Sequence, residues 1–237
     1  MTTLANSAIP LSVIAETPDY IVLNKAAGIV VHQAEQHLEP DTIANGLLAR
    51  YPELADVGED PLRPGIIHRL DQHVSGVLLV ARTQAMFLHL KEQWQQHLVR
   101  KQYIALVHGK MSRTDGEINF SIARSSQQFT KMAARPDASG KAAVTRYNVL
   151  KQYQRYALLD VEILTGRTHQ IRVHMSAIDH PIVGEQVYLP KNFKSRLQPG
   201  RLFLHAASLS FGLPDGTIVG YSAPLPDDLQ AILDGLH

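Results

Sequence analysis

The chain has 237 residues, a hydrophobic fraction of 45%, a formal net charge of +1 and no cysteine, which excludes disulfides and thiolate chemistry. No apolar run approaches the roughly 20 residues of a membrane span, and the start MTTLANSAIP lacks the basic and apolar parts of a signal peptide. We therefore expect a cytoplasmic protein with no membrane partner.

The first half of the chain predicts two strands and two helices. Residues 20–28 read as a strand ending in a turn, and the apolar run 76–81 reads as a strand buried on both faces. Asp41 is the expected N-cap of one helix. Thr83 is the expected cap of the second helix, and the residues between 51 and 65 form a loop rich in proline and glycine.

The second half predicts three strands, over 102–109, 156–166 and 201–213, and a helix that opens at Thr168 and ends before Pro181. Strands outnumber helices and often follow each other directly. This order favours an α+β fold with a mainly antiparallel sheet and flanking helices. The length allows one large domain or two fused subdomains.

Polar residues stand directly before the buried strand 76–81. In an extended backbone Arg69 and Asp71 point to one side, while His68 and Leu70 point to the other. A carboxylate and a guanidinium would then share one open edge, as in a reactive site. A structural ion pair that closes a loop explains the same pattern.

A second group of polar residues lies in TGRTHQIRVHM, residues 165–175. On the expected helix, Arg172 is at least half-buried and needs an anionic partner, for which Asp71 is an attractive candidate. Such pairing would keep the aspartate ionised. His169 and His174 are five positions apart, which does not suit a helical metal pair, so core or capping roles and no metal are expected.

Tyr103 shares a strand face with the small residue Ala105, so its ring could stack on a nucleobase. A core role for the tyrosine is the alternative.

Charge is unevenly distributed along the chain. Residues 1–62 hold nine acidic and two basic residues, whereas 124–155 hold seven basic residues and one acid. Residues 191–201 are basic without an acid. Such stretches gather phosphates or form ordinary solvated surface. The expected phosphate contacts are Arg124, Lys131, Arg135, Lys141 and Arg146.

Several motifs occur in an order that resembles the RluA-type pseudouridine synthases. They are HRLDQHVSGVLLVAR, KQYIALVHG, GRTHQIRVHM followed by HPIVGE, and LFLHAASLSF with APLP. The resemblance implies a pseudouridine synthase fold with a catalytic cleft, and isomerisation of uridines in structured RNA without cofactor or metal. Ribosomal and transfer RNA are the expected partners of a monomer. It also implies one catalytic domain over 1–237, without the N-terminal RNA-binding domain of some relatives.

The resemblance assigns roles to individual residues. Asp71 matches the catalytic aspartate, Arg172 its basic partner, and Tyr103 the tyrosine against the flipped base. Arg69 matches the arginine that fills the place of the flipped nucleotide, and Leu204 an apolar residue near the base. Substrate contacts are also expected from motif neighbours and basic residues, namely His68, Arg167, Lys131 and Arg135.

The chain departs from the family pattern at Val74, Ala26 and Glu185, and it lacks a glycine after Tyr188. These differences concern loop geometry and substrate choice.

One carboxylate suffices for the implied reaction, as a nucleophile or as a base, and the sequence leaves both routes open. Two other classes of protein are alternatives to a pseudouridine synthase. A catalytically silent RNA-binding protein would share the fold. A glycoside hydrolase would need a second carboxylate, for which Asp60 and Glu185 are weak candidates.

Overall fold

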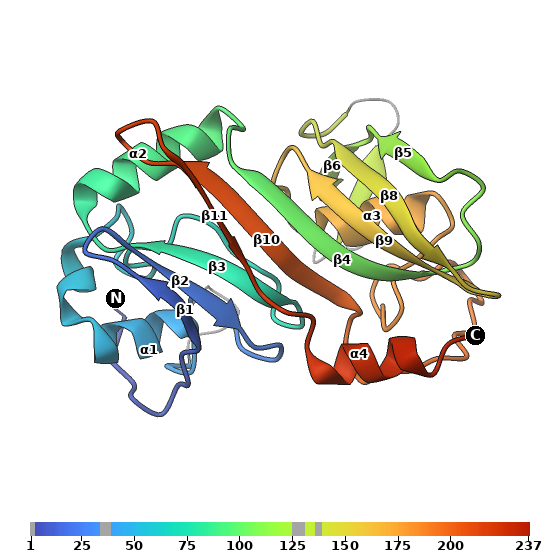
Figure 1. Ribbon diagram of the computed structural model, residues 1–237, viewed down its shortest axis with the longest axis horizontal. Helices are drawn as coiled ribbons and strands as arrows, with labels where there is room; N and C mark the ends of the chain where they lie inside the picture. The colour runs from blue at the N-terminus through green and yellow to red at the C-terminus, as the bar shows by residue number, and fades with distance from the viewer. Residues whose placement is uncertain (1–2, 34–38, 125–130, 136–138) are drawn as a thin grey trace. The chain divides into compact units, whose positions relative to one another are not determined.

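The computed structural model describes residues 3–33, 39–124, 131–135 and 139–237 (Figure 1). The chain divides into two compact units, which are described separately. Unit 1 comprises Met1–Val99 and Ala206–Pro224, and unit 2 comprises Arg100–His205 and Leu225–His237. The chain that was expected to form one catalytic domain is thus built from two units.

The sheet of unit 1 is built on a central buried strand. Strand β1 (Val13–Glu16) pairs antiparallel with β2 (Tyr20–Lys25), which pairs antiparallel with β3 (Ser75–Ala81). Strand β10 (Leu204–Gly212), whose last seven residues lie in unit 1, follows β3 in the sheet order and pairs antiparallel with β11 (Ile218–Ser222). All seven residues of β3 are buried, which confirms the prediction of a strand covered on both faces.

Gly76 allows two strands of unit 1 to approach closely. Its φ is +117°, and a Cβ atom there would lie 2.1 Å from the carbonyl oxygen of Ala206. Only glycine fits this position, because any side chain would collide with the neighbouring backbone.

Two α-helices and a 3₁₀ turn complete unit 1 (Figure 1): α1 (Ile43–Arg50), η1 (Pro52–Asp56) and α2 (Gln84–Gln95). The side chain of Thr83 accepts the Met86 N–H at 3.2 Å, so the predicted cap of α2 is confirmed.

The predicted cap of α1 is wrong by one residue. Thr42, not Asp41, is the N-cap, because the Thr42 N–H donates to Asn45 Oδ1 at 3.0 Å in a capping box.

Unit 2 contains four antiparallel strands in the order β4 (Arg100–His108), β9 (Tyr156–Ile163), β8 (Thr145–Gln152) and β5 (Asp115–Ile118). A separate two-stranded ribbon is formed by β6 (Ser121–Arg124) and β7 (Met132–Arg135). Helix α3 (Gln170–Ala177) packs on β7 and β8, and α4 (Asp227–Asp234) ends the chain (Figure 1).

Helix α3 begins two residues later than predicted. His169 is in the left-handed region with φ 54°, so the helix cannot extend back to Thr168. Antiparallel pairing and the four α-helices among the described residues confirm the expected α+β class. Within the described residues, no helix combines the length and the apolar character needed to cross a bilayer.

Candidate active site

The segment His68–Asp71 is fixed on one side by His68. The His68 Nε2 atom accepts the main-chain N–H of Leu79 in β3 at 2.9 Å, so this nitrogen carries no proton. The His68 ring stacks on Trp94 of α2, with centroids 4.7 Å apart and planes at 23°. His68 is thus a structural anchor of the segment, a role that the sequence did not predict.

A second anchor lies directly after Asp71. The Gln72 carbonyl oxygen accepts the Gly28 N–H at 2.8 Å and the Lys25 ammonium at 3.1 Å. Lys25 is 1% exposed and also donates to the carbonyl oxygens of Ala26 and Ile29, each at 2.8 Å. The half-buried Asp71 therefore lies between two fixed points. This role of Lys25 was not predicted, although a lysine at the end of a buried strand is a signal in the sequence.

Arg69 differs from the other exposed or partly exposed cations of unit 1. Within the described residues it has no carboxylate partner, whereas Arg50, Arg63, Arg82 and Lys91 are each ion-paired.

His32 lies in the field of Arg69. Burial, followed by the positive charge of Arg69, lowers the pKa of His32 to about 4. The buried Nδ1 atom of His32 has no hydrogen-bond partner in the described part of the chain. A neutral histidine leaves Arg69 and the ion-paired Arg63 as the exposed positive charges that act on His32.

Arg172 of unit 2 forms a buried, bidentate ion pair with Glu185. Arg172 Nε lies 2.8 Å from Glu185 Oε2, and Arg172 Nη2 lies 2.9 Å from Oε1. The two side chains are 9% and 0% exposed. This pair was not predicted, although both residues were candidates and a buried arginine requires a nearby anion. The pairing of Arg172 with Asp71 stays a prediction, because the two residues belong to different units.

Glu185 is held in its charged form. Its Oε1 atom also accepts the N–H groups of Gln186, Val187 and Tyr188 at 3.0, 2.8 and 3.3 Å. Burial alone would raise the Glu185 pKa, but Arg172 and the backbone N–H groups outweigh it and lower the pKa below its usual value. A carboxylate occupied in this way is a poor second catalyst for glycoside hydrolysis.

Tyr188 links Arg172 to the β6–β7 ribbon. The Arg172 guanidinium lies 5.1 Å from the centre of the Tyr188 ring. Tyr188 Oη accepts the Met132 N–H at 3.2 Å and forms a hydrogen bond with His169 Nδ1 at 2.6 Å. This role of Tyr188 was not predicted.

Hydrogen bonds between side chains fix the start of α3. Gln170 accepts from the Thr165 hydroxyl at 2.7 Å and donates to the Thr145 hydroxyl at 3.0 Å. His174 bonds Thr145 through Nδ1 at 2.9 Å and the Phe120 carbonyl through Nε2 at 3.0 Å. Burial lowers the pKa of His174, so the ring is neutral. The core role expected for His174 agrees with this network.

The other expected site residues of unit 2 are mostly buried. Tyr103 of β4 is opposite Val161 of β9 and is 8% exposed, while Leu204 is 4% exposed. Lys101 shares the strand face of Tyr103, and burial lowers its pKa to about 8. Lys101 was missed, although an ionisable residue two positions from Tyr103 was a signal.

The expected phosphate contacts of unit 2 have different settings. Lys131 directly precedes β7 and Arg135 ends it. Arg167 donates through Nε to the Ala142 carbonyl at 3.0 Å.

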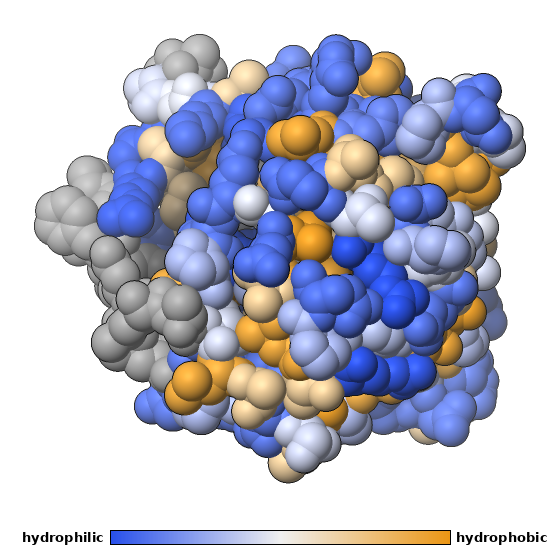
Figure 2. Space-filling model, turned by 90° about the vertical axis from the view of Figure 1, so that its left-hand side faces the viewer, coloured by the Kyte–Doolittle hydropathy of each residue, from blue (hydrophilic) through white to orange (hydrophobic). Residues whose placement is uncertain are grey.

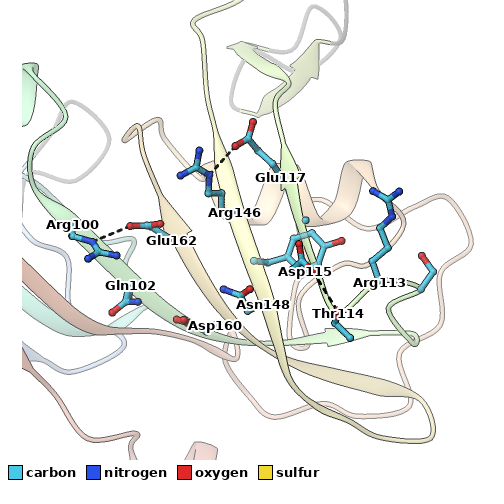
Figure 3. Close-up of a pocket in the computed structure, with 13 residues that line it drawn as sticks. Arg100, Gln102, Arg113, Thr114, Asp115, Glu117, Arg146, Asn148, Asp160 and Glu162 are labelled. Carbon is cyan, nitrogen blue, oxygen red and sulfur yellow. Dashed lines mark hydrogen bonds and ion pairs between the residues drawn. The ribbon is translucent and has the colours of Figure 1, made fainter.

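Arg146 pairs with Glu117 at 2.8 Å in an open depression of about 780 Å³ on the outer face of the sheet of unit 2 (Figure 3). Arg100 and Glu162 form a second ion pair in the same depression, at 3.3 Å. A surface whose charges neutralise each other in this way is a weak attractor for phosphate.

No group of three or more histidine, aspartate or glutamate residues that could hold a metal ion occurs among the residues that the structure describes.

The profile of the RNA pseudouridylate synthase family matches residues 19–177 of this chain. The chain therefore belongs to this family, and its relatives agree with the RluA-type motifs of the sequence. An RNA pseudouridine synthase of Chloroflexus aurantiacus, described as uncharacterized, is 46% identical over 215 residues. That match covers 90% of this chain and 66% of the relative, so the chain spans slightly less than two thirds of that protein.

Two further similarities concern a ribosomal enzyme and a solved structure. The ribosomal large subunit pseudouridine synthase D of Nitrosomonas europaea is 38% identical over 236 residues, covering 97% of this chain and 66% of the relative. The structure of human RNA pseudouridylate synthase domain containing 4 has a TM-score of 0.74 at 25% identity, covering 94% of this chain and 92% of the other. The fold is thus that of pseudouridylate synthases.

Proposed function

We propose that this chain isomerises specific uridines of structured RNA to pseudouridine, as a monomer in the cytoplasm. Family membership supports the reaction, and the observation that carries the site is Asp71 held between the anchors at His68 and Gln72. Relatives named for the ribosomal large subunit support ribosomal RNA as the substrate, with transfer RNA as the second choice.

The reaction breaks the bond from ribose C1′ to uracil N1 and forms a bond from C1′ to C5. The proton on C5 leaves and N1 gains one, so the product has the mass of the substrate. In the proposed mechanism Asp71 is the only catalytic carboxylate. It attacks the nucleotide directly or takes a proton from the sugar, and a base then removes the C5 proton.

The target nucleotide must leave the RNA stack, at a cost of a few kcal/mol. In the proposal Arg69, an exposed cation with no carboxylate partner among the described residues, fills the vacated place and offsets part of this cost. Stacking of Tyr103 on the flipped base would contribute about 1–3 kcal/mol. Leu204 would pack near the same base.

Arg172 keeps Asp71 ionised in this proposal, and Glu185 fixes the orientation of the Arg172 guanidinium. His68 acts through the backbone by positioning Asp71. Arg167, together with Lys131 and Arg135, contributes phosphate contacts that weaken with salt.

Asp71→Asn tests the catalytic role with little change of volume. We expect loss of pseudouridine formation while RNA affinity and thermal unfolding stay near wild type. Asp60→Asn is the matched control, because Asp60 is an exposed acid of unit 1 that pairs with Arg63 at 2.7 Å, and it should retain activity. Normal turnover by Asp71→Asn would reject the role.

A catalytically silent RNA-binding protein is the second candidate, because it would share this fold and its cations. It predicts that wild-type protein binds RNA but forms no pseudouridine. Mapping pseudouridines in cells with and without the gene would separate the two candidates and identify the RNA. Release of free uracil would indicate hydrolysis instead.

The role of Tyr103 is tested by two substitutions. If the ring stacks on the base, Tyr103→Phe keeps most activity and Tyr103→Ala loses most of it. Equal losses would assign the role to the hydroxyl group.

A further inference from the structure

A long loop of unit 2, residues 184–202, is closed at its base. The Phe203 N–H donates to the Val183 carbonyl at 2.8 Å, and the Val183 N–H donates to the Leu106 carbonyl of β4 at 2.8 Å. Gly184 has φ +85°, and a Cβ atom there would lie 1.9 Å from the Arg201 carbonyl oxygen. The two ends of the loop are therefore held together.

The middle of this loop packs against His108 at the end of β4. The Phe193 ring meets His108 edge-on, with centroids 4.9 Å apart, and Ser195 Oγ lies 3.3 Å from His108 Nε2. Phe193 and Ser195 are half-buried, whereas Lys194 and Arg196 are exposed. The packing therefore turns the basic side chains toward solvent.

The exposed basic residues of this region have no carboxylate partners in the part of the chain that the structure describes. Lys191, Lys194 and Arg196, defined here as the basic loop, form no ion pair within the described ranges. Lys110 and Arg155 lie close to His108, against which the loop packs, because the Gly109 N–H donates to the Arg155 carbonyl at 2.8 Å. Both residues are exposed, and neither forms an ion pair with a described residue.

Unit 1 presents a contrasting surface. Its exposed or partly exposed cations, Arg69 excepted, are neutralised by carboxylates. On the side of α1 and α2, Figure 2 shows mostly hydrophilic surface with hydrophobic side chains in small, separate groups. Within the described residues, exposed cations without a carboxylate partner are thus concentrated in unit 2, where the basic loop and its two neighbours supply five of them.

We propose that the basic loop, with Lys110 and Arg155, binds phosphate groups of the RNA substrate. This inference rests on the proposed function and adds a contact surface to it. RNA fits better than an acidic protein, because the outward side chains of residues 191–198 are cations and amides while Phe193 faces inward. Protein interfaces usually contain an apolar or aromatic centre, whereas phosphate contacts need only donors and positive charge.

The same loop reaches the proposed active site. It carries Glu185, which pairs with Arg172, and Tyr188, whose ring lies 5.1 Å from the Arg172 guanidinium. RNA held at the basic loop is therefore connected to Arg172 by a few residues of one closed loop.

The test is the triple variant Lys191→Ala/Lys194→Ala/Arg196→Ala, with an unmodified large-subunit ribosomal RNA transcript as the probe. Loss of three phosphate contacts should reduce the slope of log affinity against log salt by roughly 2–3. We expect affinity to fall roughly 10-fold or more at low salt.

The control removes three ion-paired cations of unit 1, as Arg50→Ala/Arg63→Ala/Lys91→Ala, and should leave the salt slope near wild type. Equal effects of the two triple variants would assign the result to net charge and overturn the inference. An unchanged slope in the loop variant would overturn it too. Failure of the wild-type protein to form pseudouridine would reject the proposed function instead, a result independent of the slope.

Discussion

Glu185→Gln should strongly destabilise the protein although it keeps the volume of the side chain. The substitution leaves the Arg172 guanidinium, which is 9% exposed, beside a neutral amide. Removing one member of a buried ion pair costs about 3–5 kcal/mol, because the remaining charge is uncompensated. Since whole proteins are stable by about 5–15 kcal/mol, this is a large part of the free energy of unfolding.

Urea unfolding of wild type and variant at several pH values measures this effect. The Glu185 pKa is lower in the folded state than its ordinary value of 4.5. The charged pair therefore stabilises the fold fully above about pH 4.5, and its contribution is lost as the pH falls through the lower folded-state pKa. The difference between Glu185→Gln and wild type should shrink in that acidic range.

Two companion variants sharpen the test. Glu117→Gln removes the acid of the exposed pair with Arg146 and should cost at most about 1 kcal/mol. Adding Arg172→Met to Glu185→Gln should restore part of the stability, because the unpaired charge is then gone. A cost for Glu185→Gln no larger than that of Glu117→Gln would refute the buried-pair account.

Urea unfolding also tests three other features. Gly184→Ala should lower the free energy of unfolding by about 3 kcal/mol or more, because the new Cβ atom would lie 1.9 Å from a carbonyl oxygen. The control Gly200→Ala, at a position with open space and φ +76°, should lower it by about 1 kcal/mol. Similar losses in the two variants would reject the close contact at Gly184. Thr42→Ala should lower the free energy of unfolding by about 1 kcal/mol, and Asp41→Ala by less than about 0.5 kcal/mol. The reverse order would restore Asp41 as the N-cap of α1. His68→Ala should lower the free energy of unfolding by about 2–4 kcal/mol, because it leaves the Leu79 N–H of β3 without its acceptor and removes the stacking on Trp94. A loss below about 1 kcal/mol would contradict the anchoring role of His68.

The elements that the sequence predicted well have strong local signals. A seven-residue buried run defines β3, and the hydroxyl of Thr83 caps α2. Strands β1, β5, β6, β7, β8 and β11 were not predicted. Four of them, β1, β5, β6 and β7, have only four residues each, which leaves little periodicity to detect. The boundary of α3 depends on the left-handed backbone of His169, which no side-chain pattern reveals.

The sequence predicted which residues form the candidate site better than it predicted the partners of those residues. The motifs named Asp71, Arg69 and Arg172, but they gave no indication that Glu185 would pair with the arginine 13 positions earlier. The anchoring of Asp71 by Lys25 depends on a contact between residues 47 positions apart. Such partnerships arise from the tertiary fold, so local spacing cannot predict them.

The most direct test is the pseudouridine content of an unmodified large-subunit ribosomal RNA transcript after incubation with the purified protein, measured by mass spectrometry of its nucleosides. We predict that wild-type protein converts defined uridines at constant RNA mass and that Asp71→Asn converts none. RNA that is bound but unchanged by the wild-type protein, or converted equally by both proteins, would contradict the account.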